Sequence, residues 1–225
     1  MKRRDFLIGT ALFLISGKIL GDNLIDFCDK YNEKKRYYDL PNYIYDIETK
    51  GNIKGIPSTR KREISGKGIF YNDTFITVAH VLDLKNIART KWEKTQEYEY
   101  ESYINGKKLE KKLIDFESDV AIFNLPDDLI YENFPGKIDT KIIYGKDVYM
   151  LGDPYGEGLN IRKGKICDLD GLIEKHKNYF GISCPTISGD SGTPVVNKYG
   201  ELMGLTALTV NNSLGYIKKI EEFIK

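Results

Sequence analysis

The sequence predicts an all-β protein made of two six-stranded antiparallel β-barrels, followed by a C-terminal helix. Short segments rich in β-branched and aromatic residues recur along the chain, and turn-forming residues separate them. The chain holds 21 Gly and 16 Tyr among 225 residues, a composition that suits strands joined by tight turns. The segments fall into two groups on either side of a connector, so we expect each group to form one barrel.

The first barrel is expected over residues 43–130. Its predicted strands are Tyr43–Glu48, Gly68–Tyr71, Phe75–Val78, Tyr98–Ile104, Lys107–Leu113 and Val120–Leu125. Asn105-Gly106 lies between two of them and predicts a tight hairpin, because Asn and Gly both accept the positive φ angles of such a turn. The connector that follows, Pro126–Thr140, contains two prolines and has little periodicity.

The second barrel and the helix are expected over residues 131–225. The predicted strands are Lys141–Ile143, Asp147–Leu151, Leu159–Leu169, Tyr179–Cys184, Thr193–Asn197 and Leu202–Leu208. The segment Gly215–Lys225 predicts a helix because Ile217, Ile220 and Phe223 would lie on one helical face.

Residues 1–22 have the pattern of a secretory signal, with a basic start and a short apolar run. The run is too short for a typical membrane-spanning helix. The segment Arg3–Leu7, which begins with two arginines, is similar to a twin-arginine export signal. The alternatives to export are a short membrane anchor and a buried N-terminal helix. No clean Ala-x-Ala cleavage site precedes Asp22, so an exported chain can also retain the segment as an anchor. We expect an exported protein, periplasmic or extracellular, in which residues 23–42 form a helical leader.

The most informative stretch is residues 188–194, Ser-Gly-Asp-Ser-Gly-Thr-Pro. Ser191 lies between small residues on a tight turn, where glycines allow positive φ angles and close approach. Such a turn can expose a nucleophilic hydroxyl and direct the N–H groups of Gly189 and Ser191 at a developing oxyanion. Short Gly/Asp/Ser runs are also ordinary β-turns, so catalysis needs support from residues elsewhere in the chain.

A nucleophilic serine needs a histidine as its general base and usually a carboxylate that orients the histidine. The chain has 2 histidines. His80 follows the β-branched run Phe75–Val78, which places its imidazole at the end of a predicted strand. His176 lies in a charged segment and is expected to be a solvated loop residue. His80 is therefore the predicted base.

One carboxylate stands out among the 33 Asp and Glu residues. Asp119 directly precedes the apolar strand Val120–Leu125, and a carboxylate at the start of a buried strand must be paired or hydrogen-bonded. The N–H of a histidine is a suitable partner. Asp115 and Glu117 lie nearby but are expected to be loop residues. Asp119 therefore completes a candidate Ser-His-Asp triad with the predicted base and nucleophile.

Four motifs resemble those of chymotrypsin-fold serine peptidases of the HtrA/Deg branch. They are the histidine motif Thr77–Val81, the aspartate motif Ser118–Ile122, the Gly-x-Pro-x-Gly turn in Tyr149–Gly156 and the serine motif Gly189–Gly192. The resemblance runs from about Tyr45 to the C-terminus and implies barrels of the chymotrypsin type, with the triad in the cleft between them. Only 34 residues follow Ser191, too few for the PDZ domain that many HtrA/Deg proteins carry, so we expect a peptidase domain without one.

The resemblance implies a serine endopeptidase that hydrolyses peptide bonds in proteins through an acyl-enzyme intermediate and needs no cofactor. Its substrate pocket would be lined by Thr186, Ile187, Ser188, Thr206, Ala207 and Leu208. The segment before the serine holds no acid, so a small or medium apolar substrate residue is expected in place of a basic one. Trypsin-like zymogens pair the Asp before the serine with a new N-terminus. No Ile-Val-Gly-Gly segment precedes the first barrel, so Asp190 is expected to pair with a Lys, an Arg or backbone donors.

Two other functions are compatible with these residues: a catalytically inactive peptide-binding module, and an esterase or other acyl transferase that uses the same site. The net charge of +1 gives no electrostatic case for nucleic-acid binding. No Cys-x-x-Cys or histidine cluster indicates a metal site. Cys167 and Cys184, on neighbouring predicted strands, either form a disulfide in an oxidising compartment or remain thiols.

Overall fold

The computed structural model describes residues 40–54, 62–88, 90–152, 160–169, 178–187, 189–210 and 214–224. They fall within the second of the chain's two structural units, Asp39–Lys225. The export signal expected at residues 1–22 and nearly all of the leader expected at 23–42 lie outside the described residues. The end of that leader contributes to a single 3-10 turn, η2 (Leu40–Tyr43).

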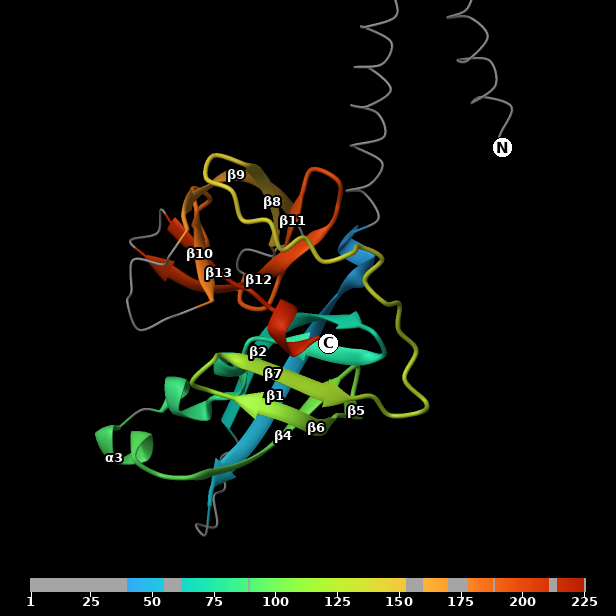
Figure 1. The fold of residues 1–225 in the computed structure, drawn as a ribbon. Coiled ribbons are helices and arrows are strands. Elements are labelled where there is room, and N and C mark those ends of the chain that lie inside the picture. Colours follow the sequence, from blue (N-terminus) through green and yellow to red (C-terminus); the bar gives the residue numbers. More distant parts are fainter. Residues whose placement is uncertain are drawn as a thin grey trace, which may run out of the picture. The chain divides into compact units, whose positions relative to one another are not determined.

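The first group of strands forms a seven-stranded antiparallel sheet in the order β5-β4-β1-β2-β3-β7-β6 (Figure 1). Its members are β1 (Ile44–Ile53), β2 (Arg62–Tyr71), β3 (Thr74–Thr77), β4 (Tyr98–Ile104), β5 (Lys107–Lys108), β6 (Glu110–Asp115) and β7 (Val120–Asn124). The hairpin expected at Asn105-Gly106 is present, and both residues have a positive φ, 50° and 76°.

This sheet curls but does not close into the six-stranded barrel expected over residues 43–130. Its edges are β5 and β6, which follow each other in the chain and pair with β4 and β7 respectively. The chain bends between them at the buried Leu109, whose N–H donates to the carbonyl of Ser102 at 2.8 Å. The single strand expected over Lys107–Leu113 is therefore divided. The two edges are joined by the chain itself, and no ladder of hydrogen bonds runs between them.

The second group of strands forms a closed six-stranded barrel in the order β10-β13-β12-β11-β8-β9 (Figure 1). The strands are β8 (Asp147–Gly152), β9 (Asn160–Asp168), β10 (Tyr179–Ile182), β11 (Pro194–Asn197), β12 (Leu202–Val210) and β13 (Leu214–Lys218). Five of the six match expected strands. The expected strand at Lys141–Ile143 is irregular backbone, and β13 takes its place in the barrel.

The prediction of a C-terminal helix over Gly215–Lys225 is wrong for the first part of that segment. Leu214–Lys218 forms β13, which pairs with β10 on one side and β12 on the other and so closes the barrel. Pairing on both sides satisfies the backbone of β13 in a place where a helix would leave both neighbours as open edges. The buried Ile217 and Ile220 fit a strand followed by a turn as well as they fit a helix. Only Glu221–Phe223 forms a 3-10 turn, η6.

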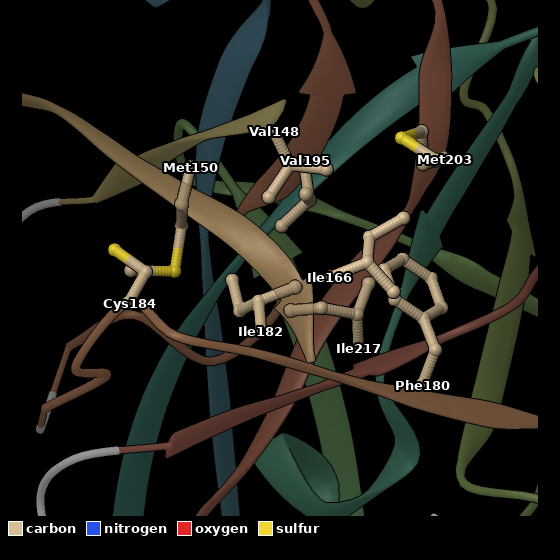
Figure 2. Close-up of a cluster of buried hydrophobic side chains, with 9 residues drawn as sticks. All are labelled: Val148, Met150, Ile166, Phe180, Ile182, Cys184, Val195, Met203 and Ile217. Atoms are coloured by element: carbon tan, nitrogen blue, oxygen red, sulfur yellow. The ribbon is translucent and has the colours of Figure 1, made fainter. Parts of the chain in front are cut away.

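The barrel interior is filled by buried apolar side chains, which point toward one another in Figure 2. Every strand of the barrel contributes to the cluster of Val148, Met150, Ile166, Phe180, Ile182, Cys184, Val195, Met203 and Ile217. Cys184 lies in this core as a free thiol, and Cys167 is also a free thiol. The structure therefore has the two-thiol alternative, with Cys184 packed opposite Gly164, where an added Cβ would lie 2.8 Å from that of Cys184.

The connector between the two groups of strands contacts both of them. Asn133 forms a parallel bridge to Phe70 of β2, and Ile138 forms a parallel bridge to Leu202 of β12. The helical segments of the described chain are short, namely η3 (Ala79–Leu82), η4 (Leu84–Ile87) and α3 (Lys91–Lys94), besides η2 and η6. Within these described ranges no helix has the length and apolar character needed to cross a membrane.

Truncating a core side chain of the barrel tests this packing. Phe180 is 0% exposed, so Phe180→Ala is expected to lower the free energy of unfolding by about 3–5 kcal/mol. Urea denaturation followed by circular dichroism measures the change. The control is Ile130→Ala at a side chain that is 92% exposed, where a change within about 0.5 kcal/mol is expected. Similar losses for the two variants would contradict the assignment of the core.

Candidate functional site

The candidate base and acid are neighbours because of the way two strands pair. β3 runs antiparallel to β7, with Thr77 opposite Ala121. The C-terminal end of β3 therefore lies beside the N-terminal end of β7. His80, in η3 just after β3, meets Asp119, which directly precedes β7.

The Asp119 carboxylate holds His80 through both its backbone and its ring. His80 Nδ1 lies 3.1 Å from Asp119 Oδ1 and 3.0 Å from Oδ2, and the backbone N–H of His80 donates to Oδ1 at 2.8 Å. An ionised carboxylate only accepts hydrogen bonds, so Nδ1 carries the proton and Nε2 is left as an acceptor in the neutral ring. Asp119 is 8% exposed, and these hydrogen bonds compensate for the burial of its carboxylate.

The turn that presents Asp119 is shaped by local hydrogen bonds. Asp119 itself has φ 53°, in the left-handed region that Asp and Asn tolerate better than most residues. Asp115 accepts the backbone N–H groups of Glu117 and Ser118, both at 2.9 Å, and thereby tightens the turn between β6 and β7. The hydrogen bonds from Ser118 hold the pKa of Asp115 below its ordinary value. Asp115 and Glu117 thus support the turn and do not contact His80 among the described hydrogen bonds.

Ser191 lies within hydrogen-bond distance of the imidazole. Its Oγ is 2.9 Å from His80 Nε2, so the serine hydroxyl can donate to the unprotonated ring nitrogen. The backbone around Ser191 is fixed from two sides. The Ser191 carbonyl accepts the N–H of Lys67 in β2 at 2.9 Å, and the N–H of Gly192 donates to Thr206 in β12 at 2.8 Å. The serine is therefore held between the sheet and the barrel.

Gly192 permits this close approach. It has φ 85°, and a Cβ at this position would lie 1.8 Å from the carbonyl oxygen of Lys67. No other residue can occupy the position without moving the two backbones apart. The same carbonyl accepts the hydroxyl of Thr77, the last residue of β3, at 2.5 Å. The glycine after the serine thus ties the candidate nucleophile to the strand that leads to His80.

The turn before Ser191 contains a residue with a positive φ, Gly189. The N–H of Asp190 donates to the carbonyl of Ile187 at 3.1 Å, and Gly189, the third residue of this turn, has φ 100°. A type I turn would have φ near about −90° there, so the positive φ excludes it. Within the described part of the chain, no hydrogen bond to another protein group uses the N–H of Gly189 or Ser191. Both groups therefore remain available as donors beside the Ser191 hydroxyl.

Asp190 pairs with an arginine, one of the partners that the sequence left open. Arg162 Nη2 lies 2.5 Å from Asp190 Oδ1, and Arg162 Nη1 donates to the carbonyl of Pro185 at 2.7 Å. Asp190 Oδ2 accepts the N–H of Ile187 at 2.8 Å, and the aspartate is 1% exposed. The pair lies against Gly152, where a Cβ would be 1.8 Å from Arg162 Nη2. Arg162 thus fastens both ends of the turn before the serine.

Some of the residues expected to line the substrate pocket are linked by hydrogen bonds. Thr186 is buried. Its hydroxyl donates to the Leu208 carbonyl at 3.3 Å and also contacts the hydroxyl of Thr209. The Thr209 hydroxyl donates to the Thr186 carbonyl at 3.1 Å. The segment before the serine is therefore tied to the end of β12, next to Ala207. Thr206 is buried, and its hydroxyl accepts a hydrogen bond from that of Thr193 at 3.2 Å.

Two positions named from the sequence cannot be placed. His176 and Ser188 lie outside the described residues. Conversely, sequence reasoning missed Tyr179, Lys67 and Thr209, which contact the site or its neighbours from strands of ordinary composition. No local motif marks these three residues, because their contacts depend on how strands distant in sequence come together.

Comparisons with known proteins agree with this architecture. The family described as a trypsin-like peptidase domain matches residues 66–205, more than half of the chain. A putative protease Do-like 14 of Arabidopsis thaliana is 26% identical over 172 residues, which cover 72% of this chain and 39% of that protein. The chain thus spans about two fifths of the length of this relative, and the resemblance to HtrA/Deg peptidases expected from the motifs is confirmed.

Solved structures share the fold. The active form of the Rv3671c protease from M. tuberculosis has a TM-score of 0.55 and 18% identity, over 82% of this chain and 78% of that one. A serine endoprotease from Yersinia pestis has a TM-score of 0.58 and 19% identity, over 85% of this chain and 66% of that one. At these identities the likeness concerns the fold alone.

The pair between the partly exposed Arg162 and the buried Asp190 makes a testable contribution to stability. Arg162→Met leaves the Asp190 carboxylate buried without its cation, so the free energy of unfolding is expected to fall by about 3–5 kcal/mol. Urea denaturation measures the change. The double variant Arg162→Met/Asp190→Asn removes the uncompensated charge and should recover part of the loss. An unchanged unfolding midpoint in Arg162→Met would show that the pair does not hold the turn.

Proposed function

The chain belongs to the trypsin-like peptidase family, and from that premise we propose that it is a serine endopeptidase that hydrolyses peptide bonds in proteins. The observation that carries the proposal is one continuous line of hydrogen bonds. It runs from Ser191 Oγ to His80 Nε2 at 2.9 Å and from His80 Nδ1 to the Asp119 carboxylate at 3.0 Å. Nucleophile, base and orienting acid are thus already within the distances that acyl transfer requires.

In the first step, Ser191 Oγ attacks the carbonyl carbon of the scissile peptide bond. His80 Nε2 takes the serine proton as the new C–O bond forms. Asp119 keeps the imidazole in the tautomer with Nδ1 protonated and stabilises the imidazolium that results. The imidazolium then gives its proton to the leaving amine, and an acyl-enzyme remains on Ser191.

The developing oxyanion is proposed to lie between the backbone N–H groups of Gly189 and Ser191. Both belong to the turn whose positive φ at Gly189 excludes a type I conformation, and the Arg162–Asp190 pair holds that turn in place. One donor of this kind typically contributes about 3–4 kcal/mol to stabilisation of the transition state. Water, deprotonated by His80, then attacks the acyl-enzyme through the same arrangement and releases the second product.

The pairing of Arg162 with Asp190 also concerns whether the protein needs proteolytic activation. In this proposal the partner of Asp190 is a side chain of the folded domain, so the turn before the serine needs no newly cut N-terminus to form. The protein would be competent once folded. Protein or peptide substrates reach the site beside Thr186 and Leu208, and a small or medium apolar residue is the proposed preference.

Replacing the nucleophile or the base tests the mechanism. Ser191→Ala is expected to lower kcat for a peptide substrate by about a millionfold, and His80→Ala by a comparable factor, because the two groups act as a unit. A quenched fluorescent peptide library, read at neutral pH, provides the substrate. The matched control is His176→Ala at the other histidine, which should keep the wild-type rate.

Near-normal hydrolysis by purified Ser191→Ala would refute the serine mechanism. A wild-type chain that binds peptides but never cleaves them would favour the inactive binding module, and cleavage of esters alone would favour an esterase.

The proposed site of action is outside the cytoplasm, by the twin-arginine route. Changing Arg3 and Arg4 together to lysine is expected to retain the protein in the cytoplasmic fraction, because paired arginines are the feature that this export route reads. Cell fractionation and immunoblotting measure the distribution, with Lys2→Ala as the control. Unchanged export of the double-lysine variant would remove the case for this route.

A further inference from the structure

The Asp119 carboxylate is also contacted by a residue of the barrel. Tyr179, the first residue of β10, donates its hydroxyl to Asp119 Oδ2 at 3.3 Å, and Tyr179 is 3% exposed. His80 and Asp119 both come from the sheet, whereas Tyr179 comes from the barrel. The hydroxyl therefore reaches the acid across the boundary between the two groups of strands.

Behind Tyr179 lies a buried lysine. Lys218 of β13 is directly opposite Tyr179 in the β10–β13 ladder and is 1% exposed. Its Nζ lies 4.8 Å from the centre of the Tyr179 ring and 5.4 Å from that of Phe223, distances typical of cation–π contacts. A lysine is almost never fully buried without compensating partners, and the rings of Tyr179 and Phe223 are two of those partners.

The charged groups around Lys218 are mostly acidic. The carboxylates of Asp119 at the start of β7, Glu222 in η6 and Asp115 in β6 act on Lys218 electrostatically, and Lys219 is the neighbouring cation. Burial lowers the pKa of Lys218, and the three carboxylates act against that decrease. Burial and the Asp119 charge raise the pKa of Tyr179, so its hydroxyl keeps its proton and remains a donor at neutral pH.

We propose that Tyr179, supported by Lys218, is a positioning residue for Asp119 in the reaction of Ser191. The hydroxyl donates to the same oxygen, Oδ2, that faces His80 Nδ1, and so opposes rotation of the carboxylate away from the imidazole. Tyr179 contacts neither the serine nor the imidazole in any described hydrogen bond. The effect proposed for Tyr179 on the reaction passes through its hydrogen bond to Asp119. This inference rests on the proposed serine mechanism and extends it to the barrel.

The direction in which loss of the Tyr179 hydroxyl or of Lys218 shifts the pH profile follows from how each acts on the Asp119 charge. A hydrogen bond to Oδ2 and a nearby ammonium both draw negative charge from the carboxylate and make it a weaker partner for an imidazolium. Removing either one strengthens that partnership. The acidic limb of the pH profile of kcat/KM should then move to higher pH in both cases. At the pH optimum, the loss of orientation lowers kcat and leaves KM unchanged, because the buried tyrosine does not touch substrate.

The test compares Tyr179→Phe with Tyr216→Phe in the full chain. Tyr216 is a matched control: it lies in β13 of the same barrel, is 1% exposed and bonds a different acid, Asp168, at 3.2 Å. Tyr179→Phe is expected to lower kcat about tenfold, with KM unchanged and the acidic limb moved to higher pH. Tyr216→Phe should leave kcat and the acidic limb of the pH profile of kcat/KM as they are in the wild type. Lys218→Met should move the limb in the same direction as Tyr179→Phe.

A second measurement does not need turnover. The downfield proton resonance of His80 Nδ1–H should shift in Tyr179→Phe and not in Tyr216→Phe, with urea midpoints confirming that both variants are folded. A folded Tyr179→Phe with wild-type kcat, limb and resonance would overturn the proposal. Failure of the proposed function looks different: the wild type itself would not cleave peptides, while the resonance comparison would still report whether Tyr179 positions Asp119.

Discussion

The buried carboxylate of Asp119 is the constraint on which the rest of the site depends. A carboxylate at the start of a strand buried on both faces is tolerated only when its oxygens are hydrogen-bonded. Here the donors are the backbone and ring of His80 and the hydroxyl of Tyr179. Satisfying the acid therefore brings the end of β3, the start of β7 and the start of β10 to one place. The imidazole is oriented as a consequence of folding, before any substrate arrives.

The serine is positioned by a second, independent set of constraints in the backbone. The Ser191 carbonyl is bonded to β2, the Gly192 N–H is bonded to β12, and the preceding turn is fastened by Arg162. These contacts involve strand backbone and an ion pair whose carboxylate is buried. In the proposed mechanism, a turn fixed in this way needs little reorganisation when negative charge develops next to it, which is the physical basis of preorganised catalysis.

The sequence predicted the parts of this arrangement that local chemistry determines. His80 after a β-branched strand, Asp119 before an apolar strand and Ser191 between glycines are each marked by their immediate neighbours, and the structure brings these three side chains together. The expectations that failed depend on distant pairing. Ile217 and Ile220 suit a helix or a strand until β10 and β12 are present on both sides of them. The bend at Leu109, which divides the expected strand, follows from where β4 and β7 lie. Arg162, Tyr179 and Lys218 carry no local signal at all.

The central claim is that the line from Asp119 through His80 makes the Ser191 hydroxyl a nucleophile. Treating the full chain with a fluorophosphonate, followed by intact-mass measurement and peptide mapping, tests this most directly. The account predicts a single adduct on Ser191 that forms in the folded wild type and is absent from folded His80→Ala and from the urea-unfolded chain. A wild-type chain that is folded yet unlabelled, or labelling of Ser191 that persists without His80, would contradict it.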